Sequence, residues 1–376
     1  MTARNVTPPL LRRSAGRGFT LVELMIALTL GLLIVAGVTS LFIGMRASYS
    51  FQDGLSRVQE NGRFAVQTLT RELRMAGYRL CPQASNIKNW LDTTSGSYLS
   101  GVYGGQPVLG WEANGTSAGD SYTVGTGTNW VTTFPEGLPP QINDPLAGSD
   151  IVVLKRESPL NLAITSTSNS NINFGNSTNI RQGKVVAAFQ QDCSAGDIWM
   201  KSNNANGTSL PLQNANGFGP GNDMGVACTF GTNSGNSNRF CSNLDTNSYI
   251  VLSEASGYYV RENPAGEPSL YAVPLDDNTA TSAQELVQGV ENMQALYGED
   301  TDGDRTADTY VAADAVNNWG NVVSVRMALL LRNDSFVQTE SDLRTYDVAY
   351  TTVTPVEDGR VRQVMTLTVA LRNRLP

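Results

Sequence analysis

The pattern of apolar and polar positions divides the chain close to its beginning. From Leu24 to Met45, 22 consecutive residues carry no charged side chain. An α-helix of that length extends about 33 Å at about 1.5 Å per residue. That length is enough to cross the hydrocarbon core of a bilayer, which is about 30 Å thick. The pattern therefore predicts a membrane-spanning helix within residues 19–45.

One acidic residue, Glu23, stands at the start of this apolar run. An ionised carboxylate in lipid costs at least about 2.5–3.5 kcal/mol, so a cation should accompany it. Cleavage between Gly18 and Phe19 would create an α-amino group within about one helical turn of Glu23. The amine of a neighbouring copy packed alongside could reach the same carboxylate.

Beyond the apolar run the polarity changes, but the helical period continues. Apolar or small residues recur at steps of three and four, at Phe51, Leu55, Val58, Gly62, Ala65, Leu69, Leu73 and Ala76. This spacing predicts one helix from Leu24 to Ala76, with Gly77 as its C-cap. We expect the stripe over residues 46–80 to pack against the chain's own β domain.

The rest of the chain shows strand patterns of two kinds. In residues 81–250, tracts rich in Asn, Gly, Ser and Thr separate short apolar runs at 150–155, 184–189 and 197–200. We expect loops and short strands there, either facing a ligand or merely solvated. Residues 249–376 contain the more regular strand patterns, and the short runs at 249–252, 258–260 and 270–273 are spaced as in an antiparallel meander. We also expect strands at 322–331 and 361–371. Residues 285–293 fit a helix or a bulged strand.

The fold class that follows is α+β, with a long N-terminal helix packed on an antiparallel β-sheet domain that carries large loop-rich insertions. The helix has a membrane half and an amphipathic half. The expected segments are a leader at 1–18, helix at 19–45 and 46–80, a loop-rich β region at 81–250 and a C-terminal sheet region at 251–376.

Composition and charge place the larger part of the chain outside the cytoplasm. The 36 glycines and only 16% charged residues are typical of secreted, loop-rich β proteins. The leader holds four of the 26 basic residues and no acid, so the remainder carries 22 basic and 34 acidic residues, a net charge of −12. The positive-inside rule keeps this leader cytoplasmic and sends the chain after Met45 outward. A domain at −12 offers no basic patch, so we expect no nucleic acid as a partner.

The four cysteines all follow the apolar run, and an even count in an oxidising compartment favours disulfides. Three pairings are possible. We favour Cys228–Cys241, which closes a short loop, together with Cys81–Cys193, which would tie the end of the helix to the β domain. A zinc site is the alternative, but the chain has no histidine and no C-x-x-C pair.

An acidic segment raises the possibility of calcium. Asp300, Asp302, Asp304 and Asp308 stand at positions 1, 3, 5 and 9 of a loop, and calcium binds six to eight oxygen ligands. The segment departs from an EF-hand at position 6, where Arg305 replaces Gly, and at position 12, where Val311 replaces Glu. The alternative is an ordinary acidic turn without an ion.

Enzymatic catalysis finds little support in the sequence. The absence of histidine excludes Ser-His-Asp and Cys-His nucleophile systems. The chain also lacks a Walker loop and a G-x-G-x-x-G motif that opens a helix. We therefore expect a protein that is not an enzyme.

The segment G-F-T-L-V-E over Gly18–Glu23, followed by the apolar run, resembles the class III signal of type IV pilins and of type II secretion pseudopilins. The resemblance implies a type IV pilin-like fold and cleavage after Gly18 by a prepilin peptidase. It also implies N-methylation of Phe19 and a role for Glu23 in docking into a growing filament.

Further segments resemble the PilW group of minor pilins, namely Q-E-N-G-R-F-A at 59–65, R-E-L-R-M-A-G-Y at 71–78, L-V-Q-G-V-E-N-M-Q-A-L-Y-G-E-D at 286–300 and V-A-L-R-N at 369–373. This resemblance implies a minor component at or near the tip of a type IV pilus that primes pilus assembly and serves twitching motility and adhesion. The implied partners are the major pilin, other minor pilins, the inner-membrane assembly machinery and a tip adhesin. The precursor would cross the bacterial inner membrane once, with its C-terminal domain in the periplasm.

Two other functions remain open at this point. The same signal fits a pseudopilin of a type II secretion machine. A different class is a membrane-tethered module that binds glycans or surfaces, in which Trp90, Trp111 and Trp130 would stack on sugars.

Overall fold

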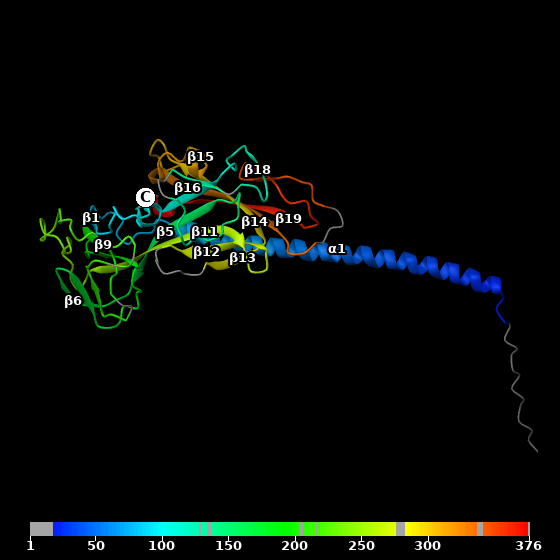
Figure 1. Ribbon diagram of the computed structural model, residues 1–376, viewed down its shortest axis with the longest axis horizontal. Helices are drawn as coiled ribbons and strands as arrows, with labels where there is room; N and C mark the ends of the chain where they lie inside the picture. Colours follow the sequence, from blue (N-terminus) through cyan, green and yellow to red (C-terminus); the bar gives the residue numbers. More distant parts are fainter. Residues whose placement is uncertain are drawn as a thin grey trace, which may run out of the picture. The chain divides into compact units, whose positions relative to one another are not determined.

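A computed structural model describes residues 18–127, 129–133, 137–203, 206–215, 217, 219–275, 283–336 and 341–374. The chain forms two units, Met1–Gln52 and Asp53–Pro376. Helix α1 (Leu21–Met75) contributes to both of them. Within the described residues, the first unit contains α1 as far as Gln52 and the short segment before it, and the second contains every β-strand (Figure 1).

The predicted helix is confirmed, and its bounds follow from local chemistry. Gly77 ends α1 with a φ of +75°, a conformation that costs glycine little because it has no Cβ. The N–H of Gly77 donates to the carbonyl of Lys155 at 2.8 Å, so the helix end joins the β domain directly. The buried stripe comprises Gly54, Val58, Gly62, Ala65, Leu69 and Leu73. The predicted stripe begins one turn too early, because Phe51 is exposed.

Nineteen strands occur in the described residues, and Figure 1 labels many of them. The largest sheet has the order β1-β9-β8-β11-β5-β2-β4, with β12 paired to β11 and β13 paired to β12. Its strands are β1 (Asn86–Asn89), β2 (Val108–Ala113), β4 (Trp130–Val131), β5 (Ile151–Leu160), β8 (Val185–Phe189), β9 (Ala195–Met200), β11 (Tyr249–Glu262), β12 (Pro268–Pro274) and β13 (Gln284–Gln288). All its pairs are antiparallel except β1 with β9.

A four-stranded antiparallel sheet has the order β15-β14-β16-β19. It consists of β14 (Val290–Glu299), β15 (Thr309–Val311), β16 (Val322–Arg332) and β19 (Arg362–Ala370), which lie next to one another in Figure 1. The amphipathic part of α1 packs here: a Cβ on Gly62 would lie 2.8 Å from Cε of Met365 in β19. Gly62 therefore allows a close approach of helix and sheet.

Two small sheets complete the described fold. One consists of β6 (Ile164–Ser168), β7 (Asn171–Phe174) and β10 (Ser209–Pro211), and the other of β3 (Ser121–Thr123), β17 (Tyr346–Val348) and β18 (Thr351–Thr354). The remaining short helices are α2 (Ser100–Tyr103), η1 (Ala313–Ala315), η2 (Trp319–Asn321) and η3 (Arg372–Arg374).

The region 81–250 is more ordered than the sequence suggests. It has a core of its own, in which Trp90, Trp199 and Phe240 are fully buried among aliphatic side chains from several loops and strands. β5 is ten residues long, twice the usual strand length, and it pairs with β11 over nine residues. The expected boundary between residues 250 and 251 lies inside β11, and both sides of it belong to one unit.

One strand prediction needs correction, and one open alternative is decided. The separate strands expected at 249–252 and 258–260 form the single 14-residue strand β11. Of the two alternatives left open for residues 285–293, the strand is confirmed: they belong to β13 and β14, which meet at Gly289 and have register shifts in their pairings. Gly289 has a φ of +86°, and a Cβ there would lie 2.4 Å from the carbonyl oxygen of Arg332.

Candidate functional site

The N-terminal end of α1 is closed by a reciprocal pair of side chains. The N–H and Oγ1 of Thr20 donate to Oε2 of Glu23 at 3.3 and 3.2 Å, and the N–H of Glu23 donates to Oγ1 of Thr20 at 3.2 Å. This is a capping box, which satisfies two of the amide groups that a helix leaves free at its start. The sequence signal was the T-x-x-E spacing, which the sequence analysis did not use.

The capping box gives Glu23 a partner that carries no charge. A carboxylate in the first turn also interacts favourably with the positive end of the helix dipole. Both effects hold Glu23 at the helix entrance, four residues from Phe19, whose side chain is 88% exposed. The predicted cleavage position, Gly18–Phe19, thus directly precedes the capped turn.

The apolar part of α1 fits a bilayer. Among the described residues, α1 is the one helix that is long and apolar enough to cross a membrane, and none of its most apolar 18-residue window is buried within the protein. Large apolar side chains from Leu21 to Met45 are more than half exposed. Their burial requires either lipid or other helices.

The structure joins the cysteines in two disulfides, Cys81–Cys193 and Cys228–Cys241, which is the pairing favoured from the sequence. Their Cα atoms are 5.2 and 5.3 Å apart, within the range that a disulfide spans. Cys81 follows the end of α1 by six residues, so the first bond ties the helix end to the loop between β8 and β9.

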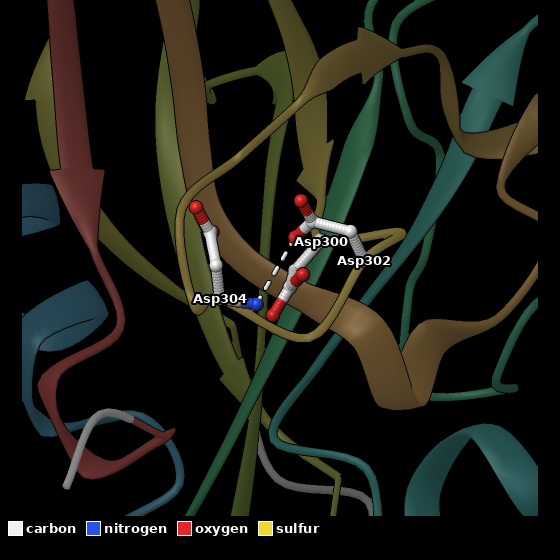
Figure 2. A group of neighbouring side chains, drawn as sticks. All are labelled: Asp300, Asp302 and Asp304. Carbon is white, nitrogen blue, oxygen red and sulfur yellow. Dashed lines mark hydrogen bonds between the residues drawn. The ribbon is translucent and has the colours of Figure 1, made fainter.

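Three of the four predicted calcium ligands come together. The carboxylates of Asp300, Asp302 and Asp304 offer oxygen atoms within 4.8 Å of one another, at the start of the loop between β14 and β15 (Figure 2). Asp308 does not join them, because its Oδ2 accepts hydrogen bonds from the N–H and Oγ1 of Thr301, both at 2.7 Å.

Backbone N–H groups of this acidic loop donate hydrogen bonds to its carboxylates. Asp300 accepts from the N–H groups of Gly303 and Arg305 at 2.6 and 2.8 Å, and Asp302 accepts from the N–H of Asp304 at 3.0 Å, the dashed line in Figure 2. Arg305 has a φ of +70°, so it takes the sharp-turn conformation that an EF-hand obtains from Gly at the same position. The three carboxylates could hold a cation, and the amides also hold them together without one.

Two of the three tryptophans proposed for sugar stacking are not available for it. Trp90 and Trp111 are buried, at 0 and 2% exposure. Trp130 is half-buried, and its Nε1 donates to the carbonyl of Ser149 at 2.8 Å. Stacking on a ligand needs an exposed ring face, so the structure contradicts this use of Trp90 and Trp111.

Comparisons with known proteins bear on the two ends of the chain. The family model PilW, described as type IV pilus-assembly protein W, matches residues 257–373. The prokaryotic N-terminal methylation motif matches residues 13–39, which include Gly18, Phe19 and Glu23. The chain thus resembles PilW-type pilins of type IV pili at both ends. No match was found among curated proteins or among solved structures.

The region that matches the PilW family model contains a buried ionic network. Glu291 of β14 accepts two hydrogen bonds from Arg362 of β19, at 2.7 and 3.1 Å, and one from Arg332 of β16 at 3.2 Å. Arg332 and Arg360 also contact Glu267, at 2.9 and 2.6 Å. The network therefore spans three strands of the four-stranded sheet, and the sequence analysis did not find it.

The central ion pair of this network is almost completely buried. The side chains of Arg362 and Glu291 are 0 and 1% exposed. Burial alone would lower the pKa of Arg362, but its bonds to Glu291 and Asp358 raise that pKa above its ordinary value. Removing one member of such a pair leaves an uncompensated buried charge, which costs about 3–5 kcal/mol.

A second buried polar group joins the two larger sheets of the chain. Asp150 accepts from the N–H groups of Ala113 in β2 and Ala295 in β14, at 2.9 and 2.8 Å. Glu112 accepts from the N–H of Ala313 at 3.3 Å. Burial, and then the nearby carboxyl of Asp150, raise the pKa of Glu112 far above its ordinary value.

Proposed function

We propose that this PilW-like pilin is a minor pilin of a type IV pilus and that it acts as a structural protein. Its precursor is cut after Gly18 by a prepilin peptidase, and the freed amine of Phe19 is methylated. The match to the N-terminal methylation motif over residues 13–39 supports this processing. The exposed apolar part of α1 supports anchoring of the precursor in a membrane.

The observation that carries the assembly step is the environment of Glu23. Its carboxylate lies at the entrance of an exposed apolar helix, and its partner Thr20 is uncharged. A carboxylate that enters a bundle of apolar helices needs a cation. The α-amino group of Phe19, from the same or a neighbouring subunit, supplies that cation only after cleavage. Glu23 then changes from a helix cap to an ion-pair partner as the helix leaves lipid for the filament.

We place the protein at or near the pilus tip, where it primes assembly together with other minor pilins. The PilW match over residues 257–373 supports a pilus component rather than a pseudopilin of type II secretion. The proposed partners are the major pilin, other minor pilins, the inner-membrane assembly machinery and a tip adhesin. The second unit would face the periplasm in the precursor and the cell exterior in the pilus.

Substitutions at Glu23 test the assembly step. Glu23→Gln retains an amide that can close the capping box but removes the charge, whereas Thr20→Ala weakens the cap and keeps the carboxylate. We expect Glu23→Gln and Glu23→Ala to be inserted into the membrane and cleaved but to be nearly absent from sheared pili on immunoblots. Thr20→Ala should enter pili at close to the wild-type level.

Two results would contradict the proposal. Normal amounts of Glu23→Ala in sheared pili would exclude the ion-pair step. Deletion of the gene should reduce surface pili and twitching motility while leaving protein secretion intact, and the reverse outcome would assign the chain to type II secretion.

A further inference from the structure

A pocket lies directly after the end of α1, within the second unit. Its walls include Tyr78 and Arg79 after the helix, Tyr103 of α2, and Lys155 and Glu157 of β5. The main chain of residues 104–107 forms one side. Arg79 donates from Nη2 to the carbonyl of Gly105 at 3.0 Å, which holds that side in place.

The strand pattern explains why the pocket is open and polar. Residues two apart on a strand share a face, so Lys155 and Glu157 both face the pocket, and Arg156 between them bonds to Glu72 and Glu254. The residues of β11 opposite Lys155 and Glu157 are Ala255 and Ser253. Their short side chains leave space beside the long polar ones.

The ammonium group of Lys155 is the unusual feature of this pocket. Lys155 is only 7% exposed, and its Nζ donates to the carbonyl of Gly104 at 2.6 Å. No carboxylate of the described residues forms an ion pair with it. An ammonium group has three donors, and a buried cation is costly unless an anion accompanies it. Two donors are therefore available to a group inside the pocket.

We propose that this pocket binds a small organic carboxylate. The carboxylate would accept hydrogen bonds from Nζ of Lys155 and lie in the positive field of Arg79. Val102, Val185 and Ile198 line the same pocket and would contact a compact apolar body. Glu157 would accept a hydrogen bond from a hydroxyl or amino group of the ligand, if the ligand carries one.

The pH dependence of binding follows from the groups that face the pocket. Burial, and then the charge of Arg79, lower the pKa of Lys155 to about 7. Burial raises the pKa of Glu157 above its ordinary value, although its bond to the N–H of Leu80 opposes this shift. As the pH falls from 8 to 6, Lys155 gains its positive charge. Binding of a carboxylate should therefore be tighter at pH 6.

Titration calorimetry with benzoate tests the proposal on the full-length chain in detergent, with both disulfides intact. Benzoate combines a carboxylate with an apolar ring. Benzamide has the same shape without the charge, and inorganic phosphate has the charge without the ring. We expect benzoate to bind at least about tenfold more tightly than either, because each lacks one of the two contacts, and to bind more weakly at pH 8 than at pH 6.

Lys155→Met keeps the length of the side chain and removes its charge. We expect it to weaken benzoate binding at least about tenfold, the effect of losing a charge-assisted hydrogen bond. Lys88→Met makes the same change outside the pocket and should bind like the wild type. Equal binding of benzoate and benzamide, equal binding by Lys155→Met and the wild type, or no benzoate binding at either pH would overturn the proposal. Because the benzamide and pH comparisons use the wild-type chain, they remain decisive if Lys155→Met does not fold.

Discussion

The carboxylate of Asp300 binds the backbone of a turn that contains two residues with positive φ values. Gly303 and Arg305 both have positive φ values, +85° and +70°. Glycine adopts this conformation freely, whereas for another L-residue it costs about 1–2 kcal/mol. The two hydrogen bonds that Asp300 accepts come from the amides of these same residues, so its carboxylate offsets the strain at Arg305.

Asp300→Asn should therefore destabilise the loop. An amide can accept only at its single oxygen and carries no charge, so we expect the free energy of unfolding to fall by about 1–3 kcal/mol. Asp304→Asn is the matched control, because Asp304 is exposed and accepts one bond, from the N–H of Thr306. It should cost less than about 1 kcal/mol in the same urea unfolding experiment. An equal cost for both substitutions would contradict this account of Asp300.

Thermal melts with calcium and with a chelator decide whether the loop also binds an ion. Ligand binding to the folded state alone raises its melting temperature by mass action. A rise with calcium that Asp302→Asn and Asp304→Asn both remove would assign the three carboxylates as ligands. Identical melting temperatures in the two solutions would leave an acidic turn held by its own amides.

Single residues were predictable where their chemistry is local. The T-x-x-E spacing of Thr20 and Glu23 could have predicted the capping box. Regular spacing of Asp residues predicted that Asp300, Asp302 and Asp304 would meet, but not that Thr301 would hold Asp308 away. Which oxygen binds which amide depends on the turn, and spacing alone does not fix the turn.

At the scale of elements, the two faces of α1 in the second unit have different tasks. Leu69 and Leu73 are fully buried against the β domain, whereas Phe64 is 54% exposed. Leu69→Ala should lower the free energy of unfolding of the isolated protein by about 2–5 kcal/mol, because it removes buried methyl groups and leaves a cavity. Phe64→Ala should change it by less than about 0.5 kcal/mol. Denaturant unfolding of both variants checks this difference, and a cost at Phe64 as large as that at Leu69 would reverse the assignment of the two faces.

Strands were predictable where apolar, β-branched residues form a continuous run, as in β16 and β19. β11 was divided in two because Ser253, Glu254 and Ser256 interrupt that pattern. The missing apolar contacts are replaced by a cross-strand ion pair between Glu254 and Arg156 at 2.9 Å. Residues 285–293 fitted a helix or a strand equally well because Gly289 interrupts the strand alternation. The pairing of β13 with β12 and of β14 with β16 shows that Gly289 separates two strands.

At the scale of the whole molecule, the order of the strands in each sheet could not be predicted from the sequence. The pairing of β5 with β11 joins segments about 100 residues apart, and no local signal specifies it. Buried acids such as Asp150 and Glu291 cannot be distinguished from ordinary surface acids by the sequence alone. The long helix and its change of polarity were predictable because the length and period of the apolar pattern determine them. Disulfide formation was predictable because the four cysteines all follow the apolar run.

The two disulfides should differ in their contribution to stability. Cys81 and Cys193 are 112 positions apart, and Cys228 and Cys241 only 13. The loss of chain entropy in the unfolded state gives about 4.7 kcal/mol for a loop of about 100 residues and about 3 kcal/mol for one of about 15. We expect the Cys81→Ala, Cys193→Ala double variant to lose about 1–2 kcal/mol more than the Cys228→Ala, Cys241→Ala variant in urea unfolding. The opposite order would show that local packing outweighs loop length.

The bond between Cys81 and Cys193 also has a mechanical consequence. The chain between them, about 110 residues, would reach about 360 Å if drawn out straight, at about 3.3 Å per residue. When the chain is pulled between α1 and its C-terminal strands, the disulfide carries the force from Cys81 to Cys193. The residues between these two cysteines are then not stretched. Force applied between α1 and the residues after Cys193 therefore cannot extend that length of chain until the bond is reduced.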